Sequence, residues 1–221
     1  MEQQDATISQ ICIDTFARIG ASISHEIKNT LSIINENAGL LEDLAAMAGD
    51  DGGVSGERIK GATASIARQV ERSNGIMKNL NRFAHSGDVP IAWVNLKEVL
   101  DLVIDLSSRQ AAMKRVVVTH TCPPAVECRT KPMAFEVLLY ELFCRVYNSA
   151  EEEADLLIEG GEQASSIVVE IRPSDRHASW SLPAPDARLL PLINHLGGTF
   201  HHEQEVFSLT LPRDIMADPA S

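Results

Sequence analysis

The sequence lacks any apolar run of the roughly 20 residues that a membrane helix needs, and its start, "MEQQDATISQ", lacks the basic and apolar parts of a signal peptide. Its four cysteines form no CxxC pair, so we expect reduced, packed thiols rather than a zinc site or a disulfide framework. Basic residues are also scarce: the net charge of −12 argues against a nucleic-acid binder. These absences predict a cytoplasmic protein without a sensor domain of its own, and without nucleic-acid or membrane partners.

The first part of the sequence has the periodicity of two helices. Apolar residues recur every three or four positions from residue 16 to 48 and again from 59 to 84. Between these stripes, the segment "GDDGGVSGE" at 49–57 breaks the pattern with glycines and acids. We therefore predict an antiparallel helical hairpin within a first domain at residues 1–86.

A two-helix hairpin has no closed core, so its apolar seam needs further helices to cover it. A second copy of the chain is the simplest source, which predicts a symmetric homodimer with a four-helix bundle at its centre. The alternative is that the C-terminal half of the same chain covers the seam.

The pattern changes after a predicted linker at residues 87–94. The following segments read as a helix, the strand "RVVVTHT", a long apolar helix, a strand–turn–strand unit, a helix interrupted by Pro191, and a closing strand pair. Mixed helices and hairpins predict an α+β fold for residues 95–213, followed by a tail at 214–221.

The segment "SHEIKN" at residues 24–29 places polar groups on the first helix. His25 is two residues from both Ile23 and Ile27, which belong to the apolar stripe. Two steps of about 100° turn its side chain away from that stripe. We therefore expect the imidazole of His25 to face solvent.

The neighbours of His25 suit phosphoryl transfer. A carboxylate at Glu26 can fix the imidazole tautomer and make the other ring nitrogen more nucleophilic. Asn29, four residues on, lies on the same helical face and can hold an oxygen in line, while Lys28 can offset phosphoryl charge. Positioning and charge stabilisation carry most of the catalysis in such reactions.

The run "SHEIKNTLSIINENAGLLEDL" resembles the H-box of two-component sensor histidine kinases, in which histidine and an acid begin an HExxN motif. The resemblance implies that His25 is phosphorylated, that Glu26 is the general base, and that Asn29 positions water in members that dephosphorylate partners. The chain departs from many relatives at Thr30, where they carry proline.

The C-terminal half resembles a degenerate copy of the ATP-binding catalytic domain of the same family. "ELFCRVYNSA" aligns with the helix whose asparagine holds the magnesium of ATP, and Arg145 replaces that asparagine. A guanidinium carries only donors and cannot ligate Mg²⁺; Asn148 would need a three-residue shift of register. The "DxGxG" motif is missing around Asp175, and so is the glycine-rich lid.

These features predict a histidine phosphotransferase that passes phosphoryl between His25 and an aspartate of a response-regulator receiver domain. We expect no strongly bound cofactor and no metal site; Mg²⁺ would come with the receiver. A hybrid histidine kinase is a further candidate partner. The alternatives are a compact ATP-dependent sensor histidine kinase, or a non-catalytic dimeric adaptor or phosphatase acting on a kinase or response regulator.

Overall fold

The computed structural model describes residues 2–47, 55–150, 153–174, 186–203 and 205–216. The chain divides into two compact units, one formed by Gly20–Asn81 and the other by Met1–Ile19 with Arg82–Ser221. Asp175 and residues 181–185, in the region where the sequence lacks the glycine-rich lid, lie outside the described residues. No helix within the described residues is long and apolar enough to cross a membrane.

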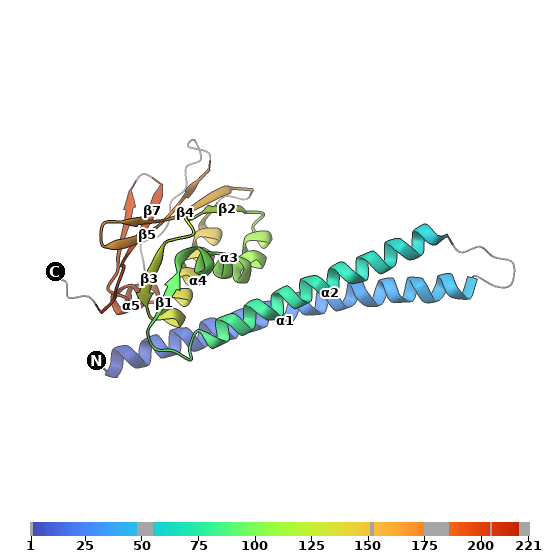
Figure 1. The fold of residues 1–221 in the computed structure, drawn as a ribbon, viewed down its shortest axis with the longest axis horizontal. Helices are drawn as coiled ribbons and strands as arrows, with labels where there is room; N and C mark the ends of the chain where they lie inside the picture. The colour runs from blue at the N-terminus through green and yellow to red at the C-terminus, as the bar shows by residue number, and fades with distance from the viewer. Residues whose placement is uncertain (1, 48–54, 151–152, 175–185, 204, 217–221) are drawn as a thin grey trace. The chain divides into compact units, whose positions relative to one another are not determined.

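Two long helices, α1 (Glu2–Met47) and α2 (Gly56–His85), confirm the predicted helical pair, and residues 20–81 of these helices make up one unit (Figure 1). The buried positions of this unit include Ile23, Leu44 and Ala62, each at most 6% exposed. These residues come from both helices, so each helix buries part of its apolar stripe against the other.

The seam of the hairpin is only partly covered. Leu31 is 51% exposed, Val70 46% and Met77 44%, although all three lie on the apolar stripes. Half-buried Ile34 and Leu41 continue the α1 stripe. A single chain therefore leaves an apolar strip open to solvent along both helices.

The other unit contains a five-stranded sheet among its described residues, in the order β2-β4-β5-β7-β6. β2 and β4 are parallel, and the remaining pairs are antiparallel. The strands are β2 (Val117–Thr121), β4 (Asp155–Gln163), β5 (Ser166–Pro173), β6 (Thr199–Glu203) and β7 (Val206–Pro212).

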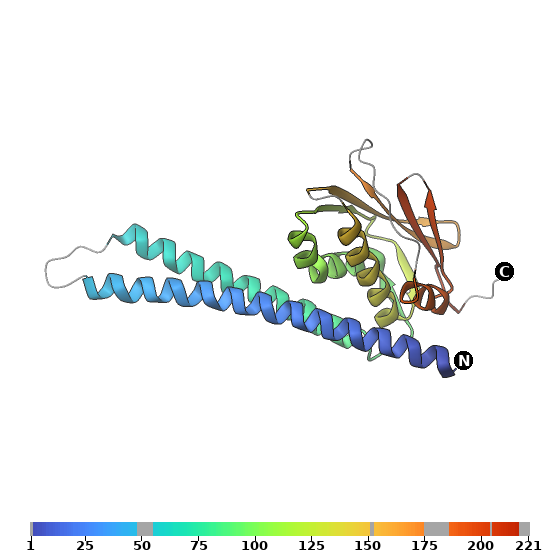
Figure 2. The same cartoon turned by 180° about the vertical axis from the view of Figure 1, so that it is seen from behind.

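Helices α3 (Leu96–Met113) and α4 (Pro132–Ser149) lie side by side on one face of this sheet (Figures 1 and 2). The side chain of Asn95 caps α3 by accepting the backbone N–H of Glu98 at 3.1 Å, and Pro132 begins α4, where a missing N–H costs nothing. The arrangement confirms the predicted α+β fold class.

The core of this unit lies between the sheet and α4. Ile167, Val169 and Ile171 alternate along β5 and are at most 1% exposed. Most residues of α4 are buried, including Phe135 and Phe143. A helix that is apolar around most of its circumference belongs at the centre of a domain.

The sequence does not predict two short strands, β1 (Ala92–Asn95) and β3 (Glu127–Thr130), which pair antiparallel in a separate small sheet. β1 overlaps the expected linker at 87–94. Short strands flanked by proline carry little local information, and their pairing depends on contacts between distant parts of the chain.

The last helix, α5 (Leu189–His195), is continuous through Pro191, so the expected interruption there is wrong. Pro191 falls in the first turn, where backbone N–H groups have no partner within the helix. The expected stop is confirmed: Gly197 follows the helix with φ of +66°, a conformation that glycine adopts without strain.

Candidate functional site

The residues of the predicted site lie together on α1. His25, Lys28 and Asn29 are exposed, whereas Glu26 is half-buried. The exposure of His25 confirms the expectation drawn from its angle to the apolar stripe. His25 and Asn29 are four residues apart and share one face of the helix.

Glu26 pairs with a residue of α2 that the sequence does not single out. Its Oε1 accepts from Nη2 of Arg72 at 3.1 Å, with the Glu26 side chain 16% exposed and the Arg72 side chain 58% exposed. Many charged residues occur along α2, and only the register of the two helices selects Arg72 as the partner.

Thr30, which stands where many relatives carry proline, is 1% exposed and joins the two helices. Its hydroxyl donates to the backbone carbonyl of Ile27 at 2.8 Å and lies 2.8 Å from the Ser73 hydroxyl. Because the single proton of Thr30 is used within α1, Ser73 donates to Thr30. A side chain that proline could not supply therefore links α1 to α2 beside the site.

A second polar cluster lies on α4, in the other unit. The carboxylate of Glu141, 7% exposed, accepts from the Thr15 hydroxyl and from the guanidinium of Arg18, both on α1. Arg188, just before α5, approaches the same oxygen at 3.4 Å and lies 3.6 Å from Asp14. Residues from three parts of the sequence thus satisfy one buried carboxylate.

Arg145, at the position expected to hold magnesium in relatives, forms an ion pair with Asp186. The backbone N–H groups of Arg188 and Leu189 also donate to Asp186, at 2.9 and 3.3 Å. Burial opposes ionisation, but these N–H groups and the guanidinium outweigh it and lower the pKa of the Asp186 carboxyl. Asn148 is exposed.

This face of α4 does not fit a magnesium nucleotide. Arg145 offers no acceptor for a metal, and the carboxylates of Glu141 and Asp186 already accept from cations of the same chain. A magnesium ion at either carboxylate would compete with these cations for its negative charge.

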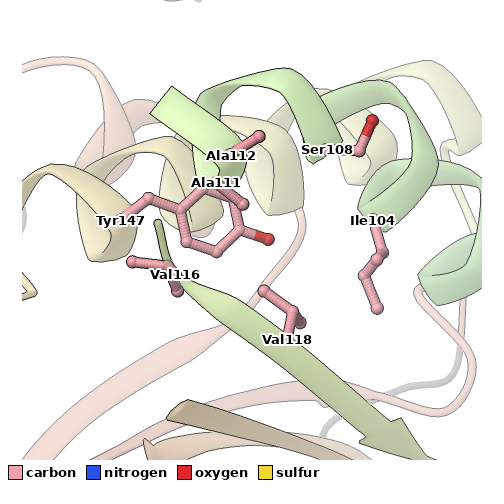
Figure 3. Close-up of a pocket in the computed structure, with 7 residues that line it drawn as sticks. All are labelled: Ile104, Ser108, Ala111, Ala112, Val116, Val118 and Tyr147. Carbon is pink, nitrogen blue, oxygen red and sulfur yellow. The ribbon is translucent and has the colours of Figure 1, made fainter. Parts of the chain in front are cut away.

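A cavity of about 220 Å³ lies between α3, β2 and Tyr147 of α4 (Figure 3). Apolar side chains and the hydroxyl-bearing Ser108 and Tyr147 line it, without a charged group among its lining residues. A phosphate ligand would find no cation there, so this cavity does not suit a nucleotide.

Within the described residues, no group of three or more histidine, cysteine or acidic side chains is placed to hold a metal ion. His195 accepts from Nζ of Lys131 at 3.0 Å. Burial and the Lys131 charge lower the pKa of His195, against a smaller opposing effect of Asp5. His202 stacks on Phe207 with 4.5 Å between ring centroids.

Comparison with known structures gives several histidine kinases. A catalytic domain of the histidine kinase ThkA has a TM-score of 0.47 at 13% identity, covering 57% of this chain and 99% of that one. Acinetobacter baumannii AdeS has a TM-score of 0.47 at 13% identity, covering 86% and 98%. ThkA in complex with the response regulator TrrA has a TM-score of 0.45 at 14% identity, covering 98% and 67%.

No family model matches the chain. Among curated proteins, the sensor histidine kinase ZraS of Klebsiella oxytoca is 25% identical over 157 residues, which are 70% of this chain and 32% of ZraS. The chain thus spans about a third of the length of that relative. This sequence similarity relates the chain to the two-component sensor histidine kinases.

Proposed function

We propose that the chain is a histidine phosphotransferase of a two-component phosphorelay, which exchanges phosphoryl between His25 and an aspartate of a response-regulator receiver domain. The observation that carries this proposal is the exposed imidazole of His25, followed by half-buried Glu26 and flanked by exposed Lys28 and Asn29. The similarity to a sensor histidine kinase supports the same chemistry.

In the proposed reaction, a lone pair on one ring nitrogen of His25 attacks the phosphorus of the receiver's aspartyl phosphate. A P–N bond forms, the P–O bond breaks, and its electron pair returns to the receiver carboxylate. Glu26 holds or accepts the proton of the other ring nitrogen, which makes the attacking nitrogen more nucleophilic. Lys28 and Asn29 steady the transferring group, and Mg²⁺ enters with the receiver.

The receiver, not ATP, is the proposed phosphoryl donor. Arg145 and Glu141, on the helix expected to contact nucleotide in relatives, pair with charged groups of the same chain. This pairing favours a phosphotransferase over the alternative of an ATP-dependent kinase.

A homodimer is part of the proposal. The exposed apolar residues Leu31, Val70 and Met77 need a partner, and a second hairpin supplies the same surface in return. The receiver would then dock on the exposed face of α1 beside His25, over exposed Ser32 and Asn35.

The test is transfer from a receiver domain carrying labelled aspartyl phosphate, with acid-labile phosphate on the chain as the readout. We expect label on the wild type and none on His25→Ala. His85→Ala is the matched control, because His85 is also an exposed helical histidine, and it should be labelled like the wild type. Label that persists on His25→Ala would assign the phosphoryl group to another residue.

A further inference from the structure

The α2 residues Arg72 and Ser73 contact one face of α1 at two successive turns. Arg72 contacts Glu26 at 3.1 Å, and Ser73 contacts Thr30 at 2.8 Å. Glu26 and Thr30 are four residues apart and therefore lie one above the other on α1. These two contacts join α2 to α1 at the level of the H-box.

The hydrogen bond between Thr30 and Ser73 is partly buried, whereas the ion pair at Glu26 is at the surface. Thr30 is 1% exposed, so the donated proton of Ser73 satisfies a hydroxyl shielded from water. The Arg72 side chain is 58% exposed, and an ion pair of that kind contributes little to folding. The hydrogen bond of Ser73 therefore does more to hold the register of α2 against α1. The ion pair of Arg72 adds little to folding, and its main effect is on the Glu26 carboxylate.

Arg72 engages only one oxygen of the Glu26 carboxylate, Oε1. A guanidinium on this oxygen restricts the rotation of the carboxylate, because the donor is held by a neighbouring helix. Oε2 has no hydrogen bond to Arg72, so it is the oxygen that the proposed interaction with the His25 imidazole would use. A fixed carboxylate selects one tautomer of the imidazole more strongly than a freely rotating one.

We propose that Arg72 is a positioning residue for phosphoryl transfer, which acts on His25 through Glu26. The inference rests on the proposed function, because it assigns a role within the same site. Arg72 touches neither the phosphoryl group nor the imidazole in this assignment. Its substitution should change the rate of transfer and the tautomer of His25, with little change in folding.

The test uses potassium phosphoramidate as phosphodonor and the full chain as acceptor. In this reaction the P–N bond of phosphoramidate breaks, ammonia leaves, and a new P–N bond forms on the histidine. Phosphohistidine is followed by ³¹P NMR, and the tautomer of His25 by ¹⁵N shifts of the ring. The variants are Arg72→Ala, Arg72→Lys, and the control Arg68→Ala, an exposed arginine one turn earlier on α2.

We expect Arg72→Ala to slow phosphorylation of His25 by about tenfold and to mix the two ring tautomers. This is less than the roughly 10²–10⁴-fold of a lost general acid or base, because Glu26 itself remains. Arg72→Lys should recover part of the rate, because a lysine keeps the charge but not the planar donor geometry. Arg68→Ala should match the wild type in both readouts.

Wild-type rate and tautomer in Arg72→Ala, with His25→Ala unlabelled, would overturn the role of Arg72 and leave the proposed function intact. Equal losses in Arg72→Ala and Arg68→Ala would also overturn it, because the effect would then be one of general surface charge. Labelling of His25→Ala would instead remove the proposed function itself.

Discussion

The face of α1 around His25 and the face of α4 around Glu141 both gather charged and polar side chains, yet they use them differently. On α4, Glu141 and Arg145 pair with groups of the same chain. On α1, the imidazole of His25, the amine of Lys28 and the amide of Asn29 remain exposed. Only Glu26 is held, and through one oxygen.

This difference separates a structural cluster from a site open to a partner. Charged groups that already satisfy one another gain little from a ligand, because binding would first break their existing contacts. Exposed groups that share one helical face keep their donors and acceptors for an incoming molecule. The comparison therefore supports the proposal that the hairpin carries the chemistry and that the α4 cluster contributes stability.

The largest expected effect concerns the open seam of the hairpin. Leu31→Asp would place a carboxylate in the proposed dimer interface twice, once from each chain. Burying each unpaired charge costs several kcal/mol, so we expect the dimer dissociation constant to rise on the order of 100-fold or more.

Light scattering at micromolar protein would then give the mass of one chain for Leu31→Asp and of two chains for the wild type. Arg68→Asp is the control, since Arg68 is exposed and lies opposite the α2 stripe. A wild type with the mass of one chain would exclude the dimer.

The next effect concerns Glu136 of α4, a carboxyl that is 4% exposed and whose Oε2 has no hydrogen-bond partner. Burial raises its pKa to about 7, although Ser86 and the Arg82 charge oppose the shift. The folded state therefore holds a proton that the unfolded chain releases near pH 4.5. Stability from this proton is fully present below that pH and is lost as the pH rises through 7, by about 3 kcal/mol.

Glu136→Gln keeps the shape of the side chain without the ionisation. We expect this variant to flatten the fall in the free energy of unfolding between pH 5 and pH 8, and to be more stable than the wild type at pH 8. Urea unfolding at several pH values measures both. A fall as steep as that of the wild type would mean that Glu136 does not cause it.

A smaller loss is expected at the α4 cluster itself. Glu141→Ala removes the acceptor of the buried Thr15 hydroxyl and the partner of Arg18, whose side chain is 46% exposed. An unsatisfied buried hydroxyl and a weakened ion pair together predict a loss of about 2 kcal/mol in the free energy of unfolding.

The matched control is Glu98→Ala, because Glu98 also pairs with an arginine but is 64% exposed. Its loss should stay below about 1 kcal/mol. Equal losses in the two variants would contradict the structural role of the Glu141 cluster.

The sequence predicts what depends on local periodicity and fails where distant segments meet. The position of His25 follows from its angle to Ile23 and Ile27, and the structure confirms its exposure. In contrast, Thr15 and Glu141 are 126 residues apart, and nothing near either residue indicates the other. Arg72 is missed for the same reason, because its partner depends on the register of two helices.

The smallest effect is expected from a substitution at Arg145. It tests whether this one side chain prevents the α4 face from binding a nucleotide. Arg145→Asn restores the side chain that the histidine kinase resemblance associates with magnesium, and it removes the partner of Asp186. We expect no heat of binding with millimolar Mg²⁺–ATP in calorimetry, for the variant as for the wild type. Glu141 would still be held by Thr15 and Arg18, and the sequence would still lack the glycines that allow close approach to phosphates. Saturable binding by Arg145→Asn would show instead that the guanidinium alone blocks an otherwise competent site, and the contrast between the two clusters would then rest on a single side chain.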